Sequence, residues 1–150
     1  MRTSKTGGCM CGAVRYTLKQ VPDHIGACHC GMCRKFSGGI ELGLDVPLDG
    51  IVWEGEDSIR IYKSSDWAER GFCGTCGSSL FYRIPRGGVM PDGMMILSAG
   101  SLDDLGDLPL TQEVYIDCKP QGYAFAGDRT QLTEQDVLDL VSASEQGSNP

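Results

Sequence analysis

The chain has 150 residues and a mass of 16.2 kDa, and 41% of its residues are hydrophobic. This size is typical of a single domain that buries its own core. The formal net charge of −7 and the pI near 4.7 argue against a nucleic-acid partner, because phosphate backbones select basic surfaces. The sequence has no apolar run long enough for a membrane span and begins MRTSKTGG, without a signal-peptide core, so we expect a cytoplasmic protein with no membrane partner.

Short stretches that alternate apolar with polar residues, rich in β-branched and aromatic side chains, predict strands. In chain order these stretches are residues 12–18, 40–46, 58–64, 78–84, 94–100 and 113–118. The 21 glycines and 7 prolines punctuate the gaps between them and indicate tight turns. We therefore predict a mainly β fold of short antiparallel strands.

One helix is predicted near the end of the chain. Thr133 begins a T-x-x-D pattern that approximates a capping box, and an apolar stripe follows at helical spacing. The stripe consists of Val137, Leu138, Leu140 and Val141. We expect it to pack on the sheet. Residues 1–6 and 145–150 are polar and are predicted to be disordered tails, which leaves a single domain over residues 7–144.

The eight cysteines fall into two pairs, one triplet and a singleton. They are Cys9 with Cys11, Cys28 with Cys30 and Cys33, Cys73 with Cys76, and Cys118 alone. In a reducing compartment, C-x-C and C-x-x-C groups indicate thiolate metal ligands rather than disulfides. A structural zinc takes four thiolates in a tetrahedron, which two chelating pairs supply when the fold brings them together. We assign this role to the two pairs.

The triplet has three thiols and therefore predicts a second zinc with one coordination position left for water or an incoming thiol. Two alternatives stay open, because Cys118 could complete a closed four-thiolate site and His29 could supply a nitrogen. In an extended segment, His29 would point to the face opposite the sulfurs of Cys28 and Cys30. Cys118 lies on a predicted strand, where a cysteine is more often a small buried hydrophobic residue than a ligand.

The order of these motifs resembles a known family. C-x-C, then C-H-C-x-x-C-R-K followed by Ser-Gly, then F-C-x-x-C-G and AGSLDD is similar to the glutathione-dependent formaldehyde-activating enzymes, also called GFA or CENP-V/GFA domains, over roughly residues 7–120. The resemblance implies a zinc-binding β-tent that holds two zinc ions per chain. Carried over by motif, the structural zinc ligands are Cys9, Cys11, Cys73 and Cys76, and the second zinc lies on Cys28, Cys30 and Cys33.

The resemblance also implies an activity of the carbon-sulfur lyase type. The family's named reaction is the condensation of glutathione with formaldehyde to S-hydroxymethylglutathione, so the implied partners are a small thiol and a small aldehyde. Arg34 and Lys35 follow the triplet and could meet the carboxylates of glutathione. Ser37, Gly38 and Gly39 could shape the pocket floor. A solvated basic pair on an exposed helical turn is an equally open interpretation of Arg34 and Lys35.

The chain departs from the family pattern after GSLDD. Many members carry a His several residues further on and later a Trp, whereas this chain offers Glu113 and Tyr123. Two other classes of function therefore stay open beside the enzyme. One is a zinc-stabilised module that binds small thiols or proteins without catalysis, and the other is a redox or metal sensor that uses the triplet. The sequence carries no prediction of the oligomeric state.

Overall fold

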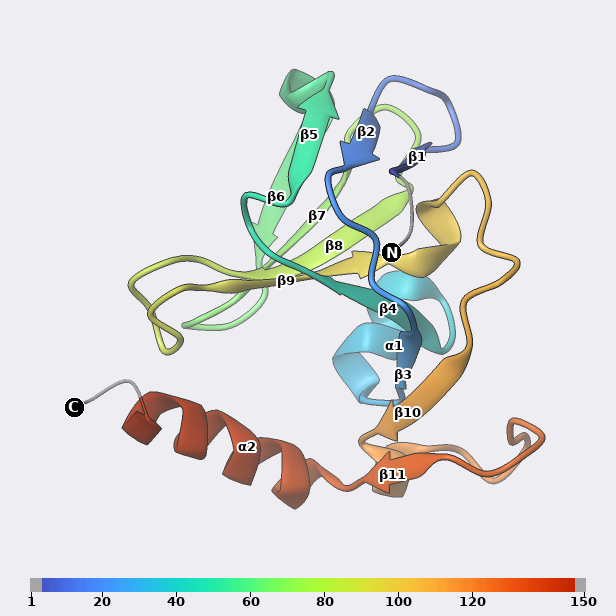
Figure 1. Cartoon of the computed structure of the whole chain (residues 1–150), viewed down its shortest axis with the longest axis vertical. Helices are drawn as coiled ribbons and strands as arrows, with labels where there is room; N and C mark the ends of the chain where they lie inside the picture. Colours follow the sequence, from blue (N-terminus) through green and yellow to red (C-terminus); the bar gives the residue numbers. More distant parts are fainter. Residues whose placement is uncertain (1–3, 148–150) are drawn as a thin grey trace.

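The computed structural model describes residues 4–147, and the expected tail residues 1–3 and 148–150 lie outside that range. The fold is mainly β and contains two sheets (Figure 1). The larger sheet has eight strands, which in spatial order are β11 (Thr130–Leu132), β10 (Leu110–Val114), β3 (Ile25–Cys28), β4 (Glu41–Val46), β9 (Met94–Ser98), β8 (Ser79–Ile84), β7 (Glu69–Cys73) and β6 (Ile59–Lys63). The smaller sheet has the order β1 (Lys5–Gly8), β2 (Arg15–Leu18) and β5 (Ile51–Glu54).

The hydrophobic core lies where the two sheets meet. Tyr16 of β2 and Phe81 of β8 are each 1% exposed, and Trp53 of β5 packs its ring between them at centroid distances of 5.5 and 5.7 Å. Leu44 and Leu97 are fully buried in the same cluster. Aromatic and aliphatic side chains from alternate positions of both sheets thus hold the sheets together.

The predicted strands are confirmed for the stretches that contain β2, β4, β6, β8 and β9. The stretch 113–118 is only partly correct, because β10 ends at Val114 and a 3-10 helix, η3 (Ile116–Cys118), follows. Most pairings are antiparallel as predicted, but β10 runs parallel to both β3 and β11. Those parallel pairings join segments far apart in the chain, which local alternation cannot reveal.

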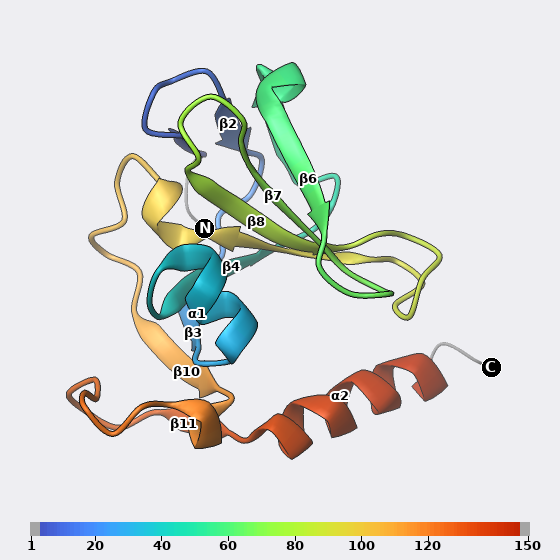
Figure 2. The same ribbon diagram turned by 180° about the vertical axis from the view of Figure 1, so that it is seen from behind.

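Besides the strands, the structure contains short helices. They are α1 (Gly31–Ser37), η1 (Glu56–Ser58), η2 (Ala99–Ser101), η3 and α2 (Glu134–Gly147). Both views of the chain show α1 beside β3 and β4 (Figure 1, Figure 2). No helix within residues 4–147 is long and apolar enough to cross a membrane.

The start of α2 is as predicted, but its surroundings are not. Thr133 and Asp136 form the reciprocal capping bonds, with Asp136 N donating to Thr133 Oγ1 at 3.1 Å and Thr133 N donating to Asp136 Oδ2 at 2.9 Å. The expectation that its apolar stripe packs on the sheet is wrong, because Leu138 and Leu140 are 47% and 59% exposed. Figure 2 shows the helix continuing from β11 and running below the rest of the ribbon. It contacts only β11 and η3 extensively.

The boundary expected after residue 6 is also corrected, since β1 includes Lys5 and Thr6. Asp103 of the AGSLDD segment explains why Lys5 and Thr6 have a defined structure. Thr6 Oγ1 donates to Asp103 Oδ2 at 2.7 Å, and Arg15 of β2 donates to both oxygens of the same carboxylate. Asp103 therefore ties the start of the chain to the smaller sheet. At the other boundary, α2 continues past residue 144 to Gly147.

Candidate metal centre

The first cysteine cluster joins two loops that are distant in sequence. Cys9 and Cys11 lie between β1 and β2, whereas Cys73 ends β7 and Cys76 lies in the turn to β8. Their four Sγ atoms all lie within 4.8 Å of one another. The Cys9–Cys11 and Cys11–Cys73 sulfur pairs are 3.6 and 3.8 Å apart. This separation matches the edge of about 3.8 Å in a tetrahedron with zinc–sulfur bonds of about 2.3 Å, so the cluster fits a zinc ion.

Backbone amides surround this cluster. Val14 N donates to Cys9 Sγ at 3.2 Å, and Thr75 N and Cys76 N donate to Cys73 Sγ at 3.4 and 3.5 Å. The turn that aims the last two amides ends at Gly77, whose φ of +81° requires a residue without a Cβ penalty. N–H donors favour the thiolate form that a metal ligand needs. The main chain is thus shaped to hold four thiolates.

The second cluster is the triplet. Cys28 ends β3, Cys30 is the N-cap of α1, and Cys33 lies in its first turns. Their Sγ atoms lie within 4.8 Å of one another, and Cys33 is buried while the other two are half-buried. Cys33 N donates to Cys30 Sγ at 3.3 Å, so a sulfur takes the usual place of a Ser or Asp cap. Neither Cys118 nor His29 joins this cluster.

Hydrogen bonding within the triplet shifts the pKa values of its thiols in opposite directions. Donation from the Cys28 and Cys33 thiols, together with the backbone N–H groups of Cys33 and Met32, lowers the pKa of Cys30 to about 2. The same bond to Cys30, a bond to Cys33 and burial raise the pKa of Cys28. A thiolate held beside other thiols is the ligand chemistry that zinc selects, so the triplet also fits the metal.

Charged and aromatic side chains surround the triplet, and the sequence analysis missed them. Arg70 of β7 is 4% exposed and places Nη1 and Nη2 at 3.8 and 3.7 Å from Cys33 Sγ. Glu41 of β4 lies directly across from Cys28 in the β3–β4 register and is 9% exposed. Burial raises the pKa of Glu41, although Ser98 Oγ donates to its carboxylate at 2.6 Å. A charged residue inside the apolar stretch IELGLDV was the one available signal for Glu41.

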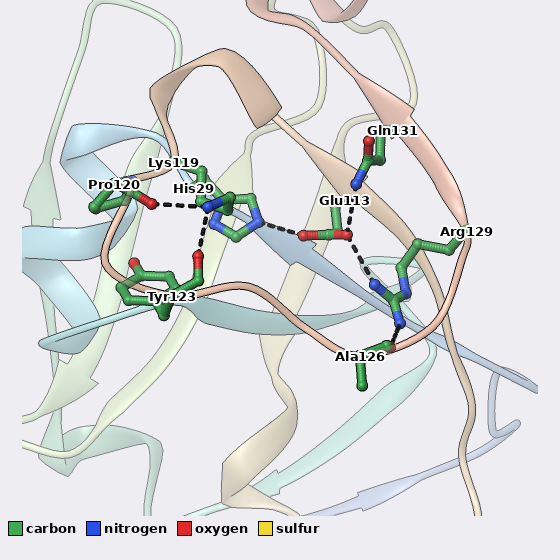
Figure 3. A network of polar contacts seen from close by, with 8 residues as sticks. All are labelled: His29, Glu113, Lys119, Pro120, Tyr123, Ala126, Arg129 and Gln131. Atoms are coloured by element: carbon green, nitrogen blue, oxygen red, sulfur yellow. Dashed lines mark hydrogen bonds and ion pairs between the residues drawn. The ribbon is translucent and has the colours of Figure 1, made fainter.

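His29 is not part of the sulfur cluster and instead enters a buried polar network (Figure 3). Its Nε2 lies 2.7 Å from Glu113 Oε1, and the other carboxylate oxygen accepts from Arg129 at 2.9 Å and Gln131 at 3.2 Å. Burial alone would raise the pKa of Glu113, but these three hydrogen bonds lower it overall. Glu113 therefore does not face the thiols. Glu113, on β10, instead connects His29, which lies between Cys28 and Cys30, to Gln131 of the neighbouring strand β11.

The expected substrate residues lie on α1. Arg34 and Lys35 are exposed in its last turn. Ser37 Oγ donates to the carbonyls of Cys33 and Gly39, and Gly38 caps the helix with φ of +85°. Helix termination accounts for the Ser-Gly sequence in this structure.

Two further residues come near the triplet from η3. The expectation that Cys118 is a buried strand residue is wrong, because it lies exposed in that 3-10 helix. Tyr115 caps η3 in the left-handed region at φ of +55°. Burial is the main cause that raises the pKa of Tyr115 to about 12, and the nearby Cys30 thiolate adds to it. Tyr123, which this chain offers where many family members carry a Trp, is 41% exposed, and its carbonyl accepts a hydrogen bond from Lys119.

Comparison with known proteins finds a family and two relatives. The sequence model of the glutathione-dependent formaldehyde-activating enzyme family matches residues 4–118. An uncharacterized lyase of Schizosaccharomyces pombe is 26% identical over 135 residues, which cover 90% of this chain and 95% of that protein. A putative glutathione-dependent formaldehyde-activating enzyme of Halomonas elongata is 34% identical over 88 residues, covering 53% of this chain and 56% of that protein.

The fold has a counterpart among solved structures. A Rhodobacter sphaeroides protein superimposes with a TM-score of 0.53 at 23% identity, over 71% of this chain and 99% of that one. The likeness in fold thus accompanies a family match that spans most of the sequence and both cysteine clusters. The chain belongs to the glutathione-dependent formaldehyde-activating enzyme family.

Proposed function

We propose that the protein is a zinc-dependent enzyme of the carbon-sulfur lyase type that combines a small thiol, glutathione, with formaldehyde or a related small aldehyde. The observation that carries this proposal is the contrast between a four-sulfur cluster and a triplet to which no fourth Cys, His, Asp or Glu ligand atom is added within residues 4–147. Three ligands leave a coordination position for a substrate atom, which is the usual mark of a catalytic zinc.

Cys28, Cys30 and Cys33 would hold this zinc, and Cys9, Cys11, Cys73 and Cys76 would hold the structural one. When bound, zinc supplies a Lewis acid that stabilises the thiolate form of an incoming thiol at neutral pH. The residues of the chain then have two tasks. The rigid β3–α1 corner fixes the site, and exposed Arg34 and Lys35 are available to the carboxylates of glutathione, with Ser37 and Gly38 ending the helix beside them.

The compartment follows from the thiols. All eight cysteines, which lie within the described range, are free, and a reducing compartment such as the cytoplasm keeps them so. We therefore place the activity there.

The first test is binding. Titration calorimetry of the zinc-loaded protein should give tighter binding of glutathione than of S-methylglutathione, because methylation removes the thiolate that a metal would take. Equal affinity for the two compounds would exclude coordination of the thiol. No binding of several small thiols would favour a non-catalytic module.

The second test is catalysis. Glutathione and formaldehyde combine without help, so the rate of S-hydroxymethylglutathione formation must exceed the uncatalysed rate. The excess should disappear in Cys30→Ser and persist in Cys118→Ser, whose cysteine lies outside both clusters. Loss of triplet zinc on mild oxidation, with no rate enhancement in the reduced protein, would favour a redox sensor instead.

A further inference from the structure

Arg70 is held rigidly beside the triplet. Its guanidinium carbon lies 5.2 Å from the ring centroid of Phe36, on α1, and 5.1 Å from that of Tyr82, its cross-strand neighbour on β8. A planar guanidinium between aromatic rings has few alternative orientations. The side chain is therefore fixed with its terminal nitrogens toward Cys33, and this contact brings together β7 and α1.

The charge of Arg70 lacks the partner that buried arginines usually have. Arg129 and Arg83 pair with the carboxylates of Glu113 and Glu69, at 2.9 and 2.5 Å. Within residues 4–147, Arg70 has no carboxylate oxygen within 4 Å, and its buried Nε has no hydrogen-bond partner. An unpaired buried cation is costly, so its charge is compensated by the acidic groups around it, which are the thiolates of the triplet and the buried carboxylate of Glu41.

The positive charge of Arg70 matters at the triplet and not at the four-cysteine cluster. Three thiolates and a divalent metal carry a net charge of −1, and a fourth, incoming thiolate makes it −2. At low dielectric, a nearby cation reduces the cost of that second charge. The four-cysteine cluster instead relies on backbone N–H donors and on Ser78, whose Oγ is 3.1 Å from Cys76 Sγ.

We propose that Arg70 is a positioning residue that holds Cys33 and supplies the positive charge that allows the triplet to accept an anionic thiolate as an additional ligand. This inference rests on the proposed function. It names the ligand class as thiolates in general, because the compensated charge is that of sulfur, whatever else the thiol carries. The proton of the incoming thiol passes to solvent.

The test uses the full chain loaded with Co(II), whose visible absorption changes when a ligand is added to the metal. The protein is titrated with glutathione, with 2-mercaptoethanol, which has no carboxylate, and with neutral imidazole. Arg70→Gln should lower the affinity for both thiols by at least about tenfold, as expected when a hydrogen bond to a charged group is lost. The affinity for imidazole should stay within about twofold of the wild-type value. A merely structural role for Arg70 would weaken all three ligands alike.

Two variants complete the design. Arg83→Gln removes a partly buried arginine from the neighbouring strand and should change no affinity by more than about twofold. Arg70→Lys keeps the charge without the planar fork, so it should lower the affinity for thiols less than Arg70→Gln does. It also replaces Arg70→Gln in the test if that variant does not fold.

The outcomes separate two failures. If the wild-type protein responds to no thiol, the proposed function is wrong. If wild type responds and Arg70→Gln binds thiols equally well, only the role of Arg70 is overturned. A loss confined to glutathione would also overturn it, because Arg70 would then be a contact for the carboxylates.

Discussion

The two cysteine clusters use the same ligand chemistry in different surroundings. Cys9 and Cys73 of the four-sulfur cluster are 7% and 0% exposed and belong to the hydrophobic core, whereas Cys11 is exposed. Main-chain N–H groups donate to the sulfurs of Cys9 and Cys73. The triplet lies at the junction of a strand and a helix, with Arg70 and Glu41 beside it. In the proposed function, ligand count and surroundings both separate a site that holds the fold from one that can exchange a ligand.

One strand connects the two regions. β7 carries Arg70 near its start and Cys73 at its end, so it contacts both clusters within five residues. Strand pairing holds β7 between β6 and β8, and the four-sulfur cluster brings its end to the loop between β1 and β2. The strand that ends in one cluster therefore carries the arginine that faces the other.

The largest expected effect comes from breaking the closed site. Cys9→Ser or Cys76→Ser should abolish soluble, folded protein, because a structural zinc contributes on the order of 10 kcal/mol to folding. Cys30→Ser should leave a folded chain. Soluble yield and thermal melting of the three variants measure this, and the reverse order of damage would show that the two sites are wrongly assigned.

The next effect concerns the support behind the triplet. Glu113→Ala should lower the free energy of unfolding by about 3–5 kcal/mol, because it leaves the buried charge of Arg129 without its partner. Glu56→Ala, an exposed glutamate of η1, is the control and should cost little. Urea unfolding measures both. If Glu113→Ala is as stable as the control, the network in Figure 3 does not hold the segment.

A smaller effect is expected at the exposed basic pair. Arg34→Ala should weaken glutathione binding by less than about 1 kcal/mol, since exposed ion pairs contribute little. Binding of 2-mercaptoethanol, which lacks carboxylates, should be unchanged. Calorimetry on Arg34→Ala and Lys35→Ala measures this. No loss in either variant would favour the solvated-pair interpretation, and a loss above tenfold would mean that the contact is desolvated.

The smallest effect is expected at Asp103, which contributes to stability and is not part of either cysteine cluster. Hydrogen bonds from Arg15 and Thr6 lower the pKa of Asp103 to about 2, below the value near 3.9 of an unfolded chain. The stabilisation is therefore complete above about pH 4 and is lost only as the pH falls toward 2. Asp103→Asn should lower the melting temperature slightly and by the same amount from pH 6 to pH 8. A difference that varies over this range would contradict the assignment.

The sequence was sufficient for features that depend on local pattern. Alternation located β2, β4, β6, β8 and β9, the T-x-x-D pattern located the start of α2, and cysteine spacing identified both groups of cysteines that the fold brings together. The absence of His29 from the sulfur cluster also followed from its place between two cysteines.

What the sequence could not reveal depends on contacts between distant segments. Arg70 reaches Cys33 across 37 positions, and Glu113 reaches His29 across 84. Exposure of the α2 stripe depends on where the sheet ends, and Cys118 is exposed because β10 stops before it. Such outcomes are set by tertiary packing, which local propensity does not encode.

The central claim is that one site is closed and the other exchanges ligands, and native mass spectrometry of gently purified protein tests it most directly. We predict two zinc ions per chain, removal of one by a mild chelator, and a glutathione adduct that forms with the two-zinc protein and not with the one-zinc protein. Cys30→Ser should carry one zinc and form no adduct. A wild-type chain that holds a single chelator-resistant zinc, or that loses two at equal rates, would contradict the account.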